Sequence, residues 1–340
     1  MPCLLTKESN KEGCKQNKIL LYDVKIEICQ KIVNKIKEYN KIICLRHADA
    51  DGDAYGSAMG LTQLIKDNFP QKQVFTDGKN NESLSFLGKN DQLAEKDYHH
   101  SLVIICDTAN QERIDSKYWN LAKEKIKIDH HIKRENYADY EWVDSTYSAT
   151  CEMLGDLAID ANLKVSKTTA NFLLLGIITD SGRFLYNNTT PRTFQIAAFL
   201  LKKAADLNFL CTNLYQQSLN LLKFKGYVIN NFVLTKQGVA FIKITLTTLK
   251  KYKVDYLEAK SIVNVLANTR KIKVWLLAVE KEKGLIKISI RSSQYIVNEV
   301  AEKYDGGGHK FAAGAKVKKW AELDNLITDL DNLISQSNFT

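Results

Sequence analysis

The chain has 340 residues, and its 48 Lys and Arg against 39 Asp and Glu give a formal net charge of +9. Its 45% hydrophobic and 26% charged residues are typical of a globular protein and exclude a disordered or collagen-like chain. At about 100–200 residues per domain, the length predicts roughly two domains. No run of 18 apolar residues occurs, so we expect no membrane-spanning helix, and the polar first 17 residues predict no signal peptide.

Arginine and cysteine usage narrows the expectation further. Only seven basic residues are arginine, and the abundance of Lys, Asn and Ile is typical of an AT-rich genome, so we assign little function to the lysines. The arginines carry more information, because a guanidinium binds phosphate bidentately and Lys cannot replace it there. The seven cysteines are scattered without a C-x-x-C pair, which argues against a disulfide framework or a zinc knuckle. We therefore expect a cytoplasmic protein with free thiols.

The first half of the chain is predicted to alternate helices and strands. Apolar residues at helical spacing predict an amphipathic helix from Asp23 to Tyr39, and further helices are expected over residues 56–68, 148–161, 168–178 and 192–205. Short apolar runs predict strands over Lys41–Leu45, Gln73–Phe75, Leu102–Cys106 and Ile126–Ile128. This alternation favours an α/β fold with a doubly wound, mainly parallel sheet.

The pattern changes after about Asp206. Residues 211–224 are predicted to form a connecting helix, and strands are predicted over residues 227–234, 238–245, 272–279 and 285–290, with helices between and after them. We expect an extension over residues 1–17, a catalytic domain over 18–205, a connecting segment over 206–225, and a smaller mixed-sheet α/β domain over 226–340. Residues 226–340 hold 18 Lys and Arg and 11 Asp and Glu, a net charge of +7, whereas residues 1–225 hold a net charge of only +2. The basic excess therefore favours a phosphate-bearing ligand at the second domain.

An acidic segment follows the first predicted strand. Strand ends are where open α/β sheets bind ligands, and this segment holds one histidine and three aspartates: His47, Asp49, Asp51 and Asp53. Such a group repels itself unless cations are bound, whereas capping the next helix would need only one of these residues. An EF-hand is a further alternative, but Ala54 replaces its turn glycine and Gly60 stands where a bidentate glutamate is needed.

Three more acidic positions follow apolar runs. Asp107 ends one predicted strand, Asp129-His130-His131 ends another, and Asp180 ends the apolar segment from Phe172 to Ile178. Asp107 alone fits an ordinary strand end, whereas two adjacent histidines beside Asp129 are a good source of nitrogen ligands. An aspartate at the end of a buried run, such as Asp180, needs a partner or a metal. Together they form a mixed histidine and carboxylate set without thiolate, which suits Mn²⁺ or Mg²⁺. Five or six ligands can hold two such ions, and a pair of metals activates water for phosphoryl displacement.

The second predicted domain contains two candidate phosphate contacts. Gly306, Gly307, Gly308 and His309 precede the stretch from Lys310 to Gly314, and glycines before a helix let backbone amides approach an anion closely. A plain glycine turn is the alternative. Arg291 follows a predicted strand beside Ser292, and its guanidinium could hold a phosphate bidentately, with an exposed strand-end arginine as the alternative.

These motifs together resemble one family. Asp129-His130-His131 is similar to the signature of the DHH phosphoesterases, and His47-x-x-x-Asp51-x-Asp53, Asp107 and Asp180 resemble the other metal motifs of that family in the same order. The stretch from Gly306 to Gly314, with Arg291, resembles the associated DHHA1 domain. The resemblance covers about residues 20–335, and the two-domain plan looks most like the nanoRNase and pAp-phosphatase group. Ala50 and Ser181 depart from the family's usual proline and threonine, but neither position is a ligand.

The resemblance implies a role for each matching residue. Two Mn²⁺ ions would be held by six residues, with Asp107 bridging: His47, Asp51, Asp53, Asp107, His130 and Asp180. His131 would lie beside the scissile phosphate and orient it or assist the leaving group. Arg291, Ser292 and the segment from Gly306 to His309 would bind another part of the substrate.

The predicted function is two-metal hydrolysis of RNA oligomers of a few nucleotides to mononucleotides, together with removal of the 3′-phosphate from the adenosine nucleotide pAp. A cyclic-dinucleotide or pApA phosphodiesterase is the nearest alternative. A RecJ-like exonuclease is disfavoured by the short chain, and a manganese pyrophosphatase by the glycine motif. An alternative of another class is a nucleotide-binding module without catalysis. We expect short oligoribonucleotides and small phosphorylated nucleotides as partners and no membrane, while a homodimer is one of the oligomeric states that the sequence leaves open.

Overall fold

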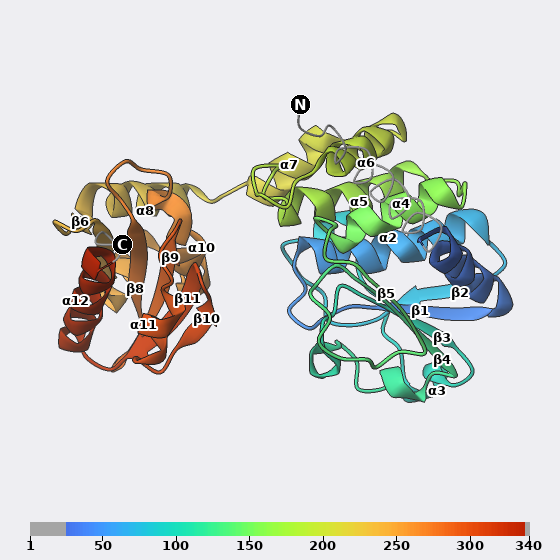
Figure 1. The fold of residues 1–340 in the computed structure, drawn as a ribbon, viewed down its shortest axis with the longest axis horizontal. Coiled ribbons are helices and arrows are strands. Elements are labelled where there is room, and N and C mark those ends of the chain that lie inside the picture. The colour runs from blue at the N-terminus through green and yellow to red at the C-terminus, as the bar shows by residue number, and fades with distance from the viewer. Residues whose placement is uncertain (1–24, 337–340) are drawn as a thin grey trace, which may run out of the picture. The chain divides into compact units, whose positions relative to one another are not determined.

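The computed structural model describes residues 25–336, and the predicted extension over residues 1–17 lies outside this range. The chain divides into two compact units, Met1–Tyr215 and Gln216–Thr340 (Figure 1). Within the described residues, no helix is long and apolar enough to cross a membrane. The following description takes each unit by itself.

The first unit is built on a five-stranded, entirely parallel sheet in the order β2-β1-β3-β4-β5. Its strands are β1 (Lys41–Leu45), β2 (Gln73–Thr76), β3 (Leu102–Cys106), β4 (Glu124–Asp129) and β5 (Tyr140–Val143). The first three match predicted strands closely, whereas β5 was not predicted, because its four residues mix polar and apolar side chains without a distinct period.

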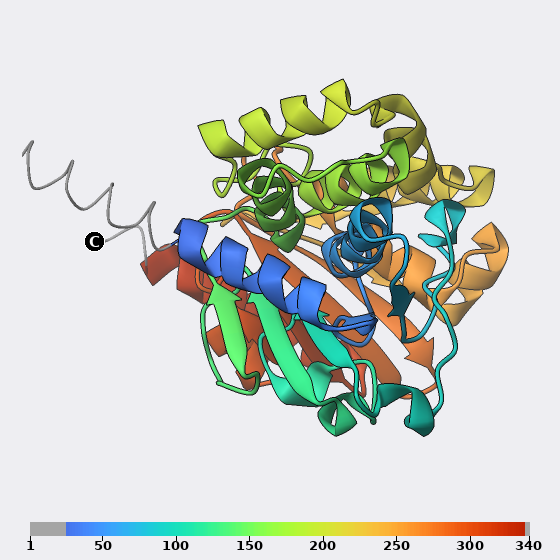
Figure 2. The same cartoon turned by 90° about the vertical axis from the view of Figure 1, so that its right-hand side faces the viewer.

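Helices cover the two sheet faces unequally. One face packs against the helix over residues 25–38 and a helical layer, shown in Figures 1 and 2, comprising α2 (Gly52–Asn68), α4 (Thr150–Asp160), α5 (Lys167–Asp180) and α6 (Pro191–Lys202). The other face packs mainly against short elements and loops, including α3 (Glu95–Tyr98), η2 (Gln111–Arg113) and η3 (Trp119–Leu121). The remaining elements are η1 (Ser85–Leu87) and α7 (Leu207–Tyr215).

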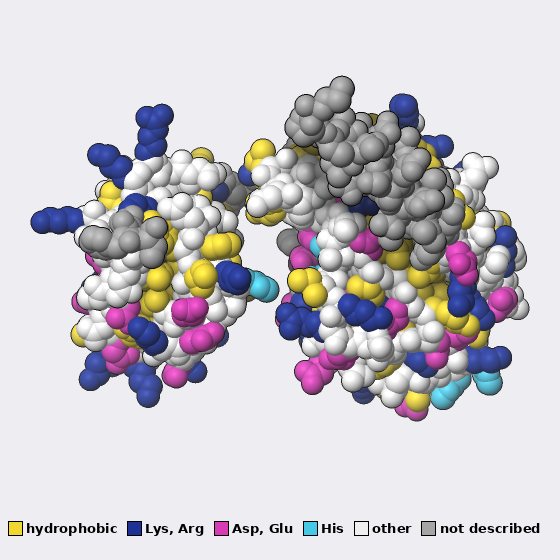
Figure 3. Space-filling model, viewed as in Figure 1, with side chains coloured by type: hydrophobic (Ala, Val, Ile, Leu, Met, Phe, Trp, Pro, Cys, Tyr) yellow, Lys and Arg dark blue, Asp and Glu magenta, His cyan; other side chains and the backbone are white. Residues whose placement is uncertain are grey.

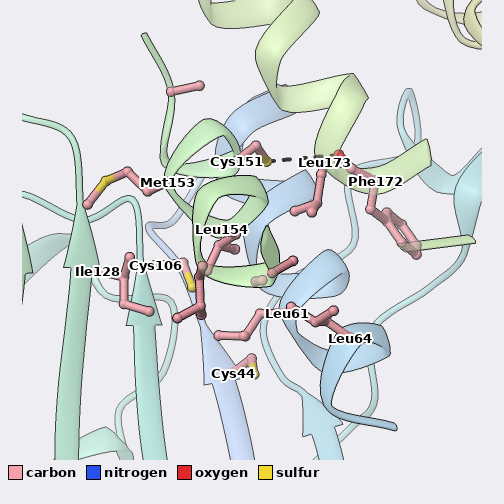
Figure 4. Close-up of a cluster of buried hydrophobic side chains, with 14 of the residues drawn as sticks. Cys44, Leu61, Leu64, Cys106, Ile128, Cys151, Met153, Leu154, Phe172 and Leu173 are labelled. Carbon is pink, nitrogen blue, oxygen red and sulfur yellow. Dashed lines mark hydrogen bonds between the residues drawn. The ribbon is translucent and has the colours of Figure 1, made fainter. Parts of the chain in front are cut away.

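The helical face holds the larger apolar core of this unit. Figure 4 shows side chains from three strands and three helices interdigitating there: Cys44, Leu61, Leu64, Cys106, Ile128, Met153, Leu154, Phe172 and Leu173. Burying one such leucine or isoleucine contributes about 1.5–3 kcal/mol to stability. Glycines bring α2 and α5 together, since a Cβ added at Gly56 would lie 2.5 Å from the Phe172 carbonyl oxygen. This close packing fixes the ends of both helices, where acidic residues lie.

The second unit has a mixed six-stranded sheet in the order β10-β11-β9-β8-β7-β6. Its strands are β6 (Val233–Leu234), β7 (Val239–Ile244), β8 (Val274–Glu282), β9 (Leu285–Ser292), β10 (Gly307–His309) and β11 (Ala312–Val317). Only β7 and β8 pair in parallel. One face packs against α11 (Asn298–Glu302) and α12 (Trp320–Gln336), and the other against α8 (Leu219–Asn231), α9 (Leu246–Tyr252), α10 (Tyr256–Ser261) and η4 (Val263–Leu266).

The connecting region departs from its prediction. Instead of one helix over residues 211–224, α7 ends at Tyr215 and α8 begins after Ser218, whose hydroxyl accepts a hydrogen bond from the Leu221 amide. The strand predicted over residues 227–234 is also wrong, because α8 continues to Asn231 and only two residues form β6. Phe224 and Val228, four residues apart, are both fully buried, so helical packing overrides the strand-like composition of this stretch.

Two further boundaries differ for local reasons. The helix expected from residue 56 begins at Gly52, because the Asp51 carboxylate accepts hydrogen bonds from the amides of Asp53 and Ala54 and caps it there. The segment after Gly306 does not enter a helix. It forms the antiparallel hairpin of β10 and β11, so the predicted placement of the glycines at a helix N-terminus is wrong.

The charges of the molecule are not segregated on the face that Figure 3 shows, where basic and acidic side chains are interspersed on both units. The net basic charge of residues 226–340 therefore does not appear there as one continuous basic surface.

Candidate metal centre

The candidate site lies at the topological switch point of the parallel sheet. Strands β1 and β3 are neighbours, and the chain leaves β1 for β2 on one side and β3 for β4 on the other. Ligands of open α/β sheets bind at such a switch point, beyond the carboxyl ends of the strands. His47 follows β1, Asp107 follows β3, and His130 follows β4, so the sheet topology brings these three side chains together.

Among the described residues, seven form three overlapping groups of possible metal ligands, one of which is Asp107, His130 and His131. Two further groups adjoin it. In one, the Nε2 atom of His47 lies 3.6 Å from Asp107 Oδ2 and 3.8 Å from Asp51 Oδ2. In the other, the Nε2 atom of His130 is surrounded by three carboxylates, at 3.2 Å from Asp180 Oδ2, 3.4 Å from Asp107 Oδ1 and 3.8 Å from Asp53 Oδ2. Asp107 presents Oδ2 to His47 and Oδ1 to His130, so its carboxylate lies between the two histidines.

Hydrogen bonds and local backbone conformation position two of these carboxylates. Asp53 accepts hydrogen bonds from the Thr150 amide at 2.7 Å and the Cys151 amide at 2.9 Å, at the N-terminus of α4, where the helix dipole favours a negative charge. Asp107 has φ of +51°, in the left-handed region that few residues other than glycine, asparagine and aspartate adopt. Its amide donates to the Ile128 carbonyl at 2.9 Å, and its carboxylate accepts from the Thr150 hydroxyl at 3.3 Å.

Gly176 is a test of how tightly Asp53 is packed. A Cβ at this position would collide with Cys151 and lie 2.5 Å from Asp53 Oδ1. We expect Gly176→Ala to destabilise the protein by about 1–3 kcal/mol, measured by denaturant unfolding, and to weaken divalent-metal binding. The control is Gly226→Ala in α8, where a Cβ meets nothing within 4 Å and helix propensity predicts stabilisation instead. Equal effects of the two substitutions would contradict this packing.

The site accumulates negative charge that only cations can balance. Burial, together with the neighbouring aspartates, raises the pKa of Asp107 well above its usual value. Burial and the charge of Asp180 raise the pKa of Asp53 to about 7. Burial opposes the charge of His130, but contact with Asp180 and the charge of Asp53 raise the pKa of His130 to about 9. Protons thus take the place that metal ions would occupy in this cluster.

The donor set and its geometry fit divalent metal ions. The Nε2 atom of His130 is buried, and no described group meets it in hydrogen-bonding geometry, although three carboxylates lie nearby. Such an orphaned nitrogen among carboxylate oxygens is expected where a metal binds. On the other side of the ring, Nδ1 lies 3.3 Å from the Tyr147 carbonyl oxygen, the kind of contact that orients a ligating histidine.

Metal binding is expected to become more stabilising as the pH rises. Since the pKa of Asp53 rises from 3.8 to about 7 and that of His130 from 6.5 to about 9, the metal-free folded state binds more protons than the unfolded chain. The stability that these two groups supply therefore falls as the pH rises towards 9. A divalent ion needs both groups deprotonated, so we expect the increase in Tm on adding Mn²⁺ to be larger at about pH 8 than at about pH 6. A pH-independent increase in a thermal-shift assay would contradict this.

His131 lies at the edge of the cluster rather than inside it. Its side chain is 39% exposed, and its Nδ1 atom lies 2.7 Å from Asp129 Oδ1 and 3.4 Å from Asp107 Oδ1. Burial opposes ionisation of Asp129, but the hydrogen bond and charge of His131 together with Lys127 lower the pKa of Asp129 below its usual value. A buried carboxylate thus orients an accessible imidazole.

In the second unit, the register places Arg291 and His309 in one row. Arg291 on β9 pairs with Ala312 on β11, which pairs with His309 on β10. Paired residues point to the same face of a sheet, so the two basic side chains lie two strands, or about 10 Å, apart with only the small Ala312 between them. His309 is exposed, and the Arg291 guanidinium donates to the Ile290 carbonyl at 2.9 Å.

The other predicted contacts of this region have clear local roles. Ser292 is buried, and its hydroxyl accepts hydrogen bonds from the amides of Gln294 and Tyr295, so it shapes the turn after β9. A Cβ at Gly306 would collide with the Gly314 carbonyl oxygen, and Gly308 has φ of +139°. Of the three glycines from Gly306 to Gly308, only Gly307 has open space around it. Close strand packing therefore accounts for two of the three glycines.

Several residues of the site were not predicted. The Thr150 hydroxyl and the Thr150 and Cys151 amides hold Asp107 and Asp53, and the only signal for them was a threonine near the start of a predicted helix. The guanidinium of Arg113 lies 3.1 Å from His47 Nδ1, which no local pattern indicated, because the contact spans 66 residues.

Comparisons with known proteins agree with this architecture. The model of the DHH family, N-terminal domain, matches residues 41–177, and that of the DHHA1 domain matches residues 238–336. The bifunctional oligoribonuclease and PAP phosphatase NrnA of Bacillus subtilis is 37% identical over 308 residues, which cover 90% of this chain and 98% of the relative. A Streptococcus mutans protein named probable bifunctional oligoribonuclease and PAP phosphatase NrnA is 39% identical over 303 residues, which cover 89% of this chain and 98% of the relative.

A solved structure shows the same fold. The crystal structure of an exopolyphosphatase-related protein from Bacteroides fragilis matches with a TM-score of 0.80 at 24% identity, covering 91% of this chain and 98% of that one. The family models, the relatives and the parallel sheet with its helical layer all point to the same assignment. The chain belongs to the DHH family of phosphoesterases, and its second unit carries a DHHA1 domain.

Proposed function

We propose that this chain hydrolyses short oligoribonucleotides to mononucleotides and removes the 3′-phosphate of pAp to give AMP. The observation that carries the proposal is Asp107, whose two carboxylate oxygens face two separate groups of histidine and aspartate ligands. Such an arrangement suits two adjacent divalent ions, the usual apparatus for phosphoryl displacement. The names of two relatives that align over nearly their whole length support the same substrates.

The proposed ligands divide into two sets that share Asp107. His47 and Asp51 would hold one ion with it, and Asp53, His130 and Asp180 would hold the other. When bound, the two ions supply an activated water nucleophile and neutralise charge on the phosphate oxygens. The mixed set of two imidazoles and four carboxylates favours Mn²⁺ over Mg²⁺, which prefers oxygen ligands and retains its water.

His131 is proposed to act on the substrate phosphate. Its Nδ1 atom contacts Asp129 Oδ1 at 2.7 Å, so a proton on that nitrogen is held in place and Nε2 remains for the substrate. The imidazole can then donate a hydrogen bond to a phosphate oxygen or a proton to the leaving oxygen, provided that Nε2 is protonated. Its 39% exposure leaves it accessible to a ligand.

The row of Arg291 and His309 is proposed to bind the part of the substrate that is not cleaved. A guanidinium beside an exposed imidazole suits a terminal phosphate, and the small Ala312 between them leaves space above the sheet. Ser292 and the segment from Gly306 to Gly308 would shape this surface. Their hydrogen bonds and close packing support the proposal by holding the two basic residues in position.

The experiment that tests the substrate assignment is turnover with Mn²⁺ on a panel. The panel contains RNA from 2-mers to 24-mers, pAp, pApA, cyclic di-AMP and short DNA, with products separated by chromatography. We expect the fastest turnover on RNA of a few nucleotides and on pAp, releasing mononucleotides and AMP. Preferential cleavage of cyclic di-AMP or pApA would favour the cyclic-dinucleotide alternative, and preference for long DNA would contradict the proposal.

A further inference from the structure

A lysine lies buried beneath the site, where the proposed chemistry gives it no part. Lys127 on β4 has a fully buried side chain, between the apolar Ile126 and Ile128 in the chain. A buried ammonium is costly unless it is paired and hydrogen bonded. The Lys127 ammonium must therefore have partners within the protein.

Three groups surround the Lys127 ammonium, and one of them, the Ala109 carbonyl, accepts a hydrogen bond from it. Nζ donates to the Ala109 carbonyl oxygen at 3.0 Å, lies 3.4 Å from Asp129 Oδ2, and lies 4.6 Å from the centre of the Tyr137 ring. The Tyr137 hydroxyl in turn donates to the Thr108 carbonyl at 2.5 Å. Lys127 and Tyr137 thus bind consecutive carbonyls of the turn that directly follows Asp107.

That turn needs external support. Asp107 has φ of +51°, an uncommon conformation that persists only where surrounding contacts impose it. On its other side, Lys127 faces the carboxylate that orients His131, since Asp129 Oδ1 lies 2.7 Å from His131 Nδ1 and Oδ2 faces the ammonium. The buried ammonium of Lys127 therefore contacts both the turn that follows Asp107 and the carboxylate that orients His131.

We propose that Lys127 is a positioning residue that fixes the Asp107 turn and the Asp129–His131 pair relative to each other. The inference rests on the proposed function, because both ends of this linkage belong to its machinery. Ion pairs of this kind seldom add net stability, since the desolvation of both charges offsets their attraction. The role of Lys127 is therefore to fix the positions of these groups, while the Tyr137 hydroxyl holds the neighbouring carbonyl of the same turn.

The test is a double-substitution cycle with Lys127→Met and Asp129→Asn, in which kcat and KM for pAp and an RNA 3-mer are measured at saturating Mn²⁺. We expect Lys127→Met to lower kcat by about 10- to 100-fold, the usual range for residues that support metal ligands. KM should change by less than about threefold, because the substrate contacts are intact. The matched control is Lys125→Met, two residues earlier on β4, where the side chain is partly exposed and should leave kcat unchanged.

The cycle separates positioning from general stabilisation. The part of the effect that passes through Asp129 is lost once Asp129→Asn is present, so Lys127→Met should lower kcat by a smaller factor in that background than in the wild-type protein. Wild-type kcat in a folded Lys127→Met protein, or losses that multiply in the double variant, would overturn the proposal. Should Lys127→Met fail to fold, the comparison of Asp129→Asn with the double variant, which buries neither charge, decides the same question.

A measurement of Mn²⁺ affinity separates the positioning role of Lys127 from the proposed function. If the wild-type protein hydrolyses neither pAp nor short RNA, the proposed function is refuted. The positioning role can still be tested in that case, by measuring the Mn²⁺ dissociation constant with calorimetry. Lys127→Met is expected to weaken Mn²⁺ binding by about tenfold through the loosened Asp107 turn, and Lys125→Met should not weaken it. Unchanged affinity together with unchanged kcat would overturn the inference.

Discussion

Replacing Asp107 with asparagine or alanine is expected to abolish hydrolysis of pAp and short RNA while the protein remains folded. The carboxylate supplies an oxygen to each of the two proposed metal positions, so its loss affects both. A decrease in kcat of more than about 10³-fold is expected, because metal charge stabilises the reacting phosphate. Burial and the neighbouring aspartates raise the pKa of Asp107 well above its usual value, so its charged form does not stabilise the metal-free protein, and the metal-free Asn variant should unfold at or above the wild-type temperature.

Asp49→Asn is the matched control for this substitution. Asp49 lies in the acidic segment after β1 and has φ of +55°, similar to that of Asp107, but it is exposed and belongs to none of the three ligand groups found among the described residues. Asparagine tolerates this backbone conformation at both positions, which excludes backbone strain as the difference. Full activity of Asp107→Asn, or an equal loss in Asp49→Asn, would contradict the role assigned to Asp107.

Replacing His131 with alanine is expected to lower kcat by about 10²- to 10⁴-fold, the usual effect of removing a general acid or base. His131 forms a possible ligand group with Asp107 and His130, but it lies outside the ligand set proposed above. Calorimetry should therefore still find Mn²⁺ binding with nearly wild-type affinity. The reason is geometric, since His131 is 39% exposed and bound to Asp129, whereas His130 is buried among carboxylates.

The other pair of adjacent histidines in this unit supplies the control. His99 and His100 are adjacent like His130 and His131, but they are exposed and follow the short helix α3, away from the described ligand groups. His99→Ala should retain wild-type kcat and Mn²⁺ affinity. Loss of metal binding in His131→Ala would instead make His131 a ligand, and an unchanged kcat would exclude it from the reaction.

Local patterns predicted most of the parallel sheet, for a physical reason. Its central strands β1 and β3 are buried on both faces, so they appear in the sequence as continuous apolar runs bounded by polar residues. Where burial is one-sided or the element is short, the pattern failed. The short strand β5 was missed, and α8 was divided between a predicted helix and a predicted strand because Tyr227 and its neighbours favour both.

The clustering of His47, Asp107 and His130 was predictable because parallel strands end at a common edge, where the residues that follow them must meet. What held these residues in place was not. The hydrogen bonds from Thr150 and Cys151 to Asp53 span almost 100 residues, and no periodicity encodes such a contact. Likewise, the glycines before His309 were expected to precede a helix, whereas the hairpin needs Gly306 for close packing and Gly308 for its positive φ.

The most direct test of the central claim is the initial rate of hydrolysis of an RNA 3-mer by chelator-treated protein as Mn²⁺ is added back. A two-metal phosphoesterase predicts no turnover without metal, recovery that saturates at two Mn²⁺ per chain, and mononucleotide products. The same titration of Asp107→Asn should recover no turnover. Hydrolysis by wild-type protein that persists in the chelator, or that is complete with one Mn²⁺ per chain, would contradict the two-metal site.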